Sequence, residues 1–128
     1  MDAVQPRVRV VHRRCAPKTY PCPHCGKPGR RKQTHQRRIR DLAYGEILLV
    51  DLAIGEYRAR CRCCKTFRAQ VEGIEPRAVY TNRVREAVIN RLLDDGMSME
   101  RLRQAMQRDF HLDLSDGFLY GCLDWKVR

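Results

Sequence analysis

Apolar residues follow two different periods along the chain, and the period changes near residue 76. Between residues 36 and 71 they alternate with polar residues or form short runs, which is typical of β-strands. From residue 81 onward they recur at every third or fourth position, as in amphipathic helices. The sequence therefore predicts an α+β protein in which a small antiparallel sheet module is followed by a three-helix bundle.

Two central strands of the predicted sheet lie on either side of a single glycine, Gly55. Residues 46–54 form an apolar run, Gly55 is interpreted as the turn that follows it, and residues 56–61 alternate strictly. Because side chains alternate across a strand, Arg58 and Arg60 share the face opposite the apolar residues. This part of the chain predicts a small core with a ridge of arginines outside it.

Two more predicted strands extend the basic ridge. Residues 67–71 repeat the alternation and place Arg68 on the polar face. A strand over residues 36–42 adds Arg38 and Arg40 to the same basic surface. The Val-rich alternation near the N-terminus leaves two alternatives open, an edge strand and a free arm.

Three helices are predicted after a boundary near residues 76–80. Thr81, Ser98 and Ser115 are interpreted as their N-caps, and Asp95-Gly96 as the end of the first. A tight link before the last helix is typical of a helix-turn-helix bundle. The apolar positions that we expect to face inward are Val84, Ala87, Val88, Leu92, Leu102, Ala105, Met106, Phe110, Phe118, Leu119, Cys122 and Trp125.

Four of the seven cysteines form two Cys-x-x-Cys pairs, Cys22/Cys25 and Cys61/Cys64. Each pair can place two thiolates on one side of a metal, and two pairs give the tetrahedral four-thiolate set that Zn²⁺ prefers. Gly26 can adopt the positive φ that such a turn requires. Thirty-five residues separate the pairs, more than the usual spacer of about 15–20. We therefore expect one structural Zn²⁺ in a zinc-ribbon-like domain with a long insertion.

Unliganded thiols, disulfides and a redox pair are the alternatives to zinc. Residues 1–18 contain no apolar segment of the kind found in a signal peptide, which disfavours disulfides. Neither pair precedes a helical pattern, as a thioredoxin-like redox motif requires. Cys63 is an alternative ligand to Cys64. The residues expected to have no metal role are Cys15, Cys122, His24 and His35.

The net charge of +11 is unevenly distributed. Residues 1–40 contain 12 lysines and arginines against one acid, whereas the two kinds balance in the rest of the chain. Such density predicts a polyanion partner, which we interpret as double-stranded DNA. A basic tail that only aids solubility is the alternative. No amphipathic helix accompanies the charge, so we expect no membrane partner. The expected DNA contacts are Arg30, Arg31, Lys32, Arg37, Arg38, Arg40, Arg58, Arg60 and Arg68, with Ser115 and Tyr120 from the helices.

These parts together resemble the N-terminal region of bacterial insertion-sequence transposases of the ISL-three kind, over roughly residues 20–128. The motifs that carry the resemblance are Cys22-Pro23-His24-Cys25-Gly26, His35-x-x-Arg38-Ile39-Arg40-Asp41-Leu42 and Arg58-x-Arg60-Cys61-x-x-Cys64-Lys65-Thr66-Phe67. The resemblance implies that the four paired cysteines bind zinc and that the basic module and the helices recognise terminal inverted repeats. The RNase H-like catalytic domain of such a transposase would begin where this chain ends, so we expect no strand transfer.

The sequence therefore predicts a basic N-terminal arm over 1–19, a zinc-ribbon-like domain over 20–76 and a helix-turn-helix-like domain over 77–128. We expect a cytoplasmic, nucleoid-associated, sequence-specific DNA-binding protein that has no small-molecule substrate and is not an enzyme, because a four-thiolate zinc site has no open coordination position. The alternative is a zinc-ribbon adaptor that binds a protein partner, such as a transposase, or dimerises through its helices.

Overall fold

The computed structural model describes residues 5–62 and 65–127 of the chain. It is an α+β structure with one mixed sheet and three helices, so the predicted class is confirmed. The strands are β1 (Arg7–Cys15), β2 (Thr19–Pro21), β3 (Pro28–Asp41), β4 (Glu46–Arg58) and β5 (Thr66–Arg68). The helices are α1 (Asn82–Ile89), which continues into a π-helical turn (Asn90–Asp94), α2 (Met99–Phe110) and α3 (Asp116–Val127).

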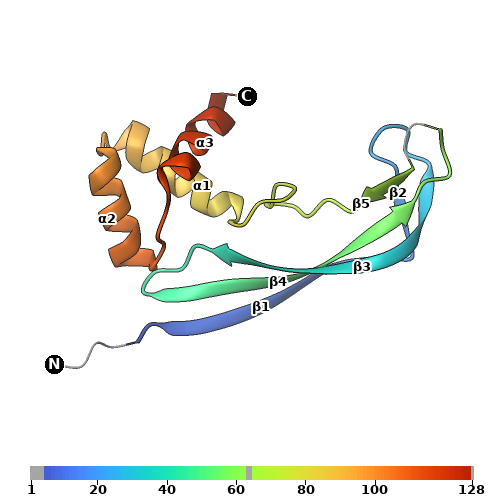
Figure 1. Cartoon of the computed structure of the whole chain (residues 1–128), viewed down its shortest axis with the longest axis horizontal. Coiled ribbons are helices and arrows are strands. Elements are labelled where there is room, and N and C mark those ends of the chain that lie inside the picture. Colours follow the sequence, from blue (N-terminus) through green and yellow to red (C-terminus); the bar gives the residue numbers. More distant parts are fainter. Residues whose placement is uncertain (1–4, 63–64, 128) are drawn as a thin grey trace.

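The sheet is built around β4. Its strand order is β1-β4-β3-β2, and β5 also pairs with β4. β3 pairs antiparallel with β4 along nearly the whole of both strands, whereas β1 runs parallel to β4 on the other edge. The prediction of a purely antiparallel sheet is therefore wrong for β1. β3 lies between β1 and β4 in the sequence and runs in the opposite direction, so that β1 and β4 run toward the same end of the sheet (Figure 1).

Of the two alternatives for the Val-rich N-terminal segment, an edge strand and a free arm, the structure shows the edge strand. Val8 and Val10 lie opposite Ile47 and Leu49 in the parallel register, and both valines are exposed. β1 ends at Cys15, and beyond this point β5 takes over the same edge of β4. The division of the chain into an arm, a zinc-ribbon-like domain and a helical domain stays a prediction.

Gly55 does not form the predicted turn. It lies inside β4, where an added Cβ would stand 2.4 Å from the hydroxyl oxygen of Tyr57. Tyr57 is fully buried, and its hydroxyl donates a hydrogen bond to the carbonyl oxygen of Pro17 at 2.8 Å. A glycine in a strand can mark a turn or a close approach. Here it marks the place where an aromatic ring covers the backbone.

One hydrophobic core lies on a single face of the sheet. Buried residues alternate along β4 from Leu48 to Ile54, and Ile39 of β3 joins them. The segment that leads from β5 to α1 crosses this face (Figure 1) and buries Ala69 and Ile74 against it. The strand predicted over residues 67–71 is shorter in the structure, where β5 ends at Arg68, but Phe67 and Ala69 are buried in this core.

A second core lies between the three helices, which sit over one end of the sheet (Figure 1). Every residue expected to face inward is buried or half-buried there, so the helical periodicity is confirmed. The hydroxyls of Ser98 and Ser115 accept backbone N–H groups at the starts of α2 and α3, as predicted for N-caps. Thr81 precedes α1, but its hydroxyl donates instead to Asp41 on β3 at 2.6 Å.

We expect Gly55→Ala to lower the free energy of unfolding by about 2 kcal/mol, as overpacking of a filled core does. The Tyr57 ring cannot move away without losing its bond to Pro17. Urea denaturation provides the measurement.

Gly121→Ala in α3 is the matched control, since an added Cβ there meets nothing within 4 Å. Alanine favours a helix over glycine by about 1 kcal/mol, so this variant should be at least as stable as the wild type. Equal effects of the two substitutions would contradict the close approach at Gly55.

Candidate metal centre and basic surface

The first cysteine pair lies in the turn between β2 and β3. The Cys22 N–H donates to the carbonyl oxygen of Lys27, and the Gly26 N–H donates to that of Cys22, both at 2.9 Å. Gly26 has a φ of 77°, as expected for a turn that directs backbone N–H groups toward sulfur. Cys22 is buried and Cys25 is exposed. The two thiols therefore bridge the core and the surface.

The second pair lies between β4 and β5. The Ala59 N–H donates to the carbonyl oxygen of Lys65 at 2.9 Å and closes this hairpin. Cys61 is half-buried and packs against the sheet core. The predicted ligand Cys64 and its alternative Cys63 lie outside the described residues.

The antiparallel register of β3 and β4 brings the two hairpins together. Arg30 near the start of β3 lies opposite Arg58 at the end of β4, so both turns close at the same end of the sheet. The sulfur atoms of Cys22, Cys25 and Cys61 lie within 4.8 Å of one another. These three residues could hold a metal ion.

The sulfur spacing suits a metal better than a disulfide. The Sγ atoms of Cys22 and Cys61 are 3.6 Å apart. Two thiolates bound at about 2.3 Å to one tetrahedral Zn²⁺ stand about 3.8 Å apart, whereas a disulfide bond measures about 2.05 Å. Cys25 is exposed and leaves a route by which an ion enters.

Three aromatic rings pack together next to the two cysteine hairpins. The ring of Tyr57 stacks on those of Tyr20 and Phe67, with centroid separations of 5.4 and 5.7 Å, and the rings of Tyr20 and Phe67 lie 6.5 Å apart. An added Cβ at Gly29 would lie 2.6 Å from the Phe67 ring. Gly29 is therefore required where β3 passes over that ring, and the predicted strand, which begins only at residue 36, does not include it.

Among the described residues, the metal cluster does not include Cys15, Cys122 or the histidines. Cys122 is buried in the helical core, where burial raises the pKa of its thiol to about 11. Cys15 lies against the carbonyl oxygen of Gln70. His35 approaches Glu56 at 3.4 Å, and His24 is exposed.

Four of the predicted DNA contacts are exposed at the hairpin end of the sheet or close to it. These residues are Arg30, Arg58, Arg60 and Arg68. Within the part of the chain that the structure describes, none of the four forms an ion pair. Arg30 and Arg58 lie directly opposite each other, an arrangement of like charges that is unfavourable without a counter-charge.

The other predicted basic contacts have polar partners on the protein itself. Arg31 donates to the carbonyl oxygen of Ala16 at 2.6 Å, Arg37 to that of Ala78 at 2.5 Å, and Lys32 lies 3.9 Å from Glu56. Alternating charge in the sequence could not reveal these contacts, because each partner lies 15 or more positions away in the sequence.

Arg38 is held by a carboxylate on the neighbouring strand. Its Nε and a terminal nitrogen donate to the two oxygens of Asp51 at 2.6 and 3.0 Å. This hydrogen-bonded pairing holds the pKa of Asp51 below its usual range. Arg38 reaches the solvent with its charge already compensated.

Arg40 connects the sheet to the helices. Its guanidinium donates to the carbonyl oxygens of His111 at 2.8 Å and Phe110 at 3.4 Å, at the end of α2. Burial lowers the pKa of Arg40. The Gly45 N–H adds a bond to the carbonyl oxygen of Asp109 nearby. Sequence reasoning missed this structural role.

The two predicted contacts on α3 differ in accessibility. Ser115 is exposed, but its hydroxyl oxygen already accepts the N–H of Phe118. Tyr120 is 63% exposed and points out of the bundle. Of the two, Tyr120 has the more accessible polar group.

Comparisons with protein-family models, curated proteins and solved structures find no match for this chain. Among the described residues, no helix has the length and apolar character needed to cross a membrane.

We expect the protein to bind one Zn²⁺, and Cys22→Ser, Cys25→Ser and Cys61→Ser each to weaken that binding at least tenfold, since each removes a thiolate ligand. Competition with a chromophoric chelator measures the affinity. Cys64→Ser and Cys63→Ser, compared in the same assay, identify the fourth ligand.

Cys15→Ser and Cys122→Ser are the matched controls, since both thiols lie outside the cluster. Affinity that falls equally in the controls and in the three site variants would contradict a metal centre at the hairpin end.

Proposed function

We propose that this chain is a zinc-stabilised, sequence-specific DNA-binding protein in which a zinc-ribbon-like hairpin end presents arginines to the duplex. The observation that carries the proposal is the opposed pair Arg30 and Arg58, exposed beside the cysteine cluster without an ion-pair partner among the described residues. Phosphates of a nucleic acid provide the counter-charge that such a pair lacks.

Zinc contributes rigidity in this proposal. The hairpin end has few core residues apart from the stacked rings, and a metal that links both hairpins would hold their arginines at a fixed spacing. Four thiolates would leave Zn²⁺ no open position, so no catalytic step is assigned to it.

Recognition of terminal inverted repeats is the specific form of the proposal, and it comes from the resemblance to ISL-three transposases. The helices would act as a helix-turn-helix in which α3 offers Tyr120 to base edges. DNA binding would place the protein at the nucleoid in the cytoplasm.

The adaptor hypothesis has less structural support. Docking of a partner on α3 would need apolar residues exposed there, but Leu119 is fully buried and Phe118 packs against Tyr80 with ring centroids 4.6 Å apart. Trp125 donates to Glu75 at 3.3 Å. These side chains are used inside the molecule.

We expect Arg58→Ala combined with Arg60→Ala to weaken binding to duplex DNA and to reduce the salt slope of log K by about 2, because two phosphate contacts are lost. Fluorescence anisotropy at several salt concentrations measures both quantities.

Arg101→Ala combined with Arg103→Ala removes the same charge from exposed positions on α2 and is the control. An equal reduction of the slope in the control would show that net charge alone, and not the hairpin end, governs binding.

We expect Asp51→Asn to strengthen DNA binding and to steepen the salt slope by about 1, since it releases Arg38 to contact a phosphate. The same anisotropy titration provides the measurement. A slope equal to that of the wild type would confine the DNA contacts to the hairpin end and remove Arg38 from the interface.

A further inference from the structure

A pocket of about 710 Å³ opens beside the cysteine hairpins, between the sheet and the segment that leads to α1. Its size lies within the range of about 300–1,000 Å³ that is typical of small-molecule sites. One part of its lining is apolar and includes Pro23, Phe67 and Pro76. The pocket is thus able to cover the apolar or planar body of a ligand.

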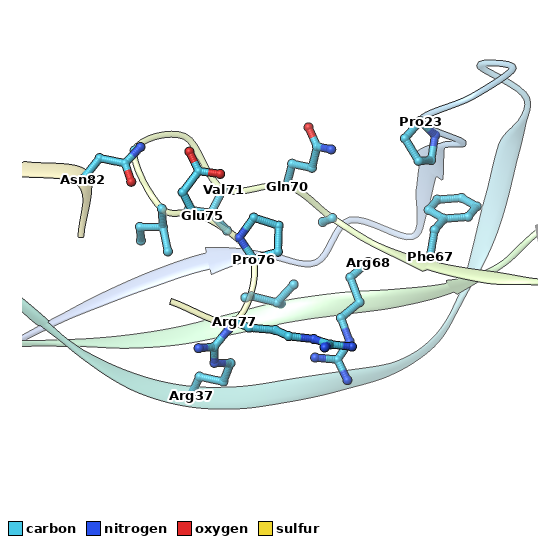
Figure 2. A pocket seen from close by; sticks show the side chains of 14 residues that line it. Pro23, Arg37, Phe67, Arg68, Gln70, Val71, Glu75, Pro76, Arg77 and Asn82 are labelled. Carbon is cyan, nitrogen blue, oxygen red and sulfur yellow. The ribbon is translucent and has the colours of Figure 1, made fainter. Parts of the chain in front are cut away.

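Three arginines from separate segments line the same pocket. Arg37 comes from β3, Arg68 from β5 and Arg77 from the segment before α1. One terminal nitrogen of Arg37 already donates to the carbonyl oxygen of Ala78, and its other N–H groups are left for a ligand. Figure 2 shows them gathered on one side of the pocket, with the ends of Arg68 and Arg77 directed toward each other. Among the described residues of the lining, Glu75 is the single acid, and it already accepts a bond from Trp125. The lining therefore carries excess positive charge.

The backbone at Arg77 is an independent sign of function. Residues 75–78 form a turn closed by the Ala78 N–H, which donates to the carbonyl oxygen of Glu75 at 3.1 Å. Arg77 occupies its third position with a φ of 63°. After proline at the second position, such a turn favours glycine or asparagine there. An arginine kept in a left-handed conformation at a charged pocket points to a role for its side chain.

A buried acceptor also lines the pocket. The Oδ1 atom of Asn82, at the start of α1, is buried and has no hydrogen-bond partner among the described residues.

We propose that this pocket binds a nucleoside monophosphate unit, with the phosphate at Arg37, Arg68 and Arg77 and the nucleoside against the apolar wall. Guanidinium groups bind phosphate through paired, charge-assisted hydrogen bonds. The unit is either a free nucleotide or the 5′-terminal nucleotide of a DNA strand. The site goes beyond duplex binding: it shares Arg68 with the exposed arginines of the hairpin end, but Arg30, Arg58 and Arg60 do not line it.

The test compares adenosine 5′-monophosphate (AMP), adenosine and inorganic phosphate by calorimetry, and 5′-phosphorylated with 5′-hydroxyl duplexes by anisotropy. If the pocket binds a free nucleotide, we expect AMP to bind more tightly than adenosine or phosphate. If it binds the end of a strand, we expect the 5′-phosphorylated duplex to bind more tightly than the 5′-hydroxyl duplex. Either preference supports the site. The absence of both preferences overturns it, and phosphate binding as tight as AMP binding overturns the role of the apolar wall.

Variants separate this site from general charge effects. Arg77→Asn and Arg68→Gln should each weaken the preferred ligand about tenfold, as loss of one charged hydrogen bond does. Arg101→Gln on α2 should leave it unchanged, and an equal loss there overturns the proposal. Arg77→Asn should also keep or raise the midpoint of thermal unfolding, since asparagine suits a positive φ. The Arg58/Arg60 variant should retain the preference, so failure of the two proposals can be distinguished.

Discussion

A β-strand has two hydrogen-bonding edges, and β4 uses both of them along almost its whole length. β3 occupies one edge, while β1 and β5 divide the other at Gly55. Because β3 runs antiparallel to β4, its start returns to the end of β4, and both cysteine hairpins close at one place. The metal-binding potential therefore depends on strand pairing more than on the conformation of either loop.

The helices and the local hairpin chemistry were predictable because they depend on residues close together in sequence. Serine caps, a helical apolar period and Gly26 each act within one turn of the chain, and the structure confirms them. The three thiols that cluster were likewise expected from their spacing. Gly55 was misinterpreted, since a glycine between two apolar stretches marks either a turn or a covered backbone, and only the packing of Tyr57 distinguishes them.

The parallel pairing of β1 and the partners of individual arginines could not be predicted, because they depend on residues far apart in the sequence. Alternation shows which face a residue occupies but not which strand lies beside it, so the direction of β1 was undetermined. Arg38 and Arg40 have the same exposed pattern in sequence, yet one binds a carboxylate across the sheet and the other binds carbonyls 70 and 71 positions away. The basic surface is thus smaller than the count of arginines indicates.

The parallel pairing of β1 has a consequence for the order of folding. Each pair between β1 and β4 joins residues 39 positions apart, whereas β3 and β4 are joined by a short turn. Local contacts form faster than distant ones, so the β3–β4 hairpin should form first and β1 should dock late, although it is synthesised first. Until then, nine positions of β4 present an open edge of the kind through which nascent chains associate. Once β1 has docked, this arginine-rich strand occupies the edge and prevents neighbouring molecules from pairing with β4 there.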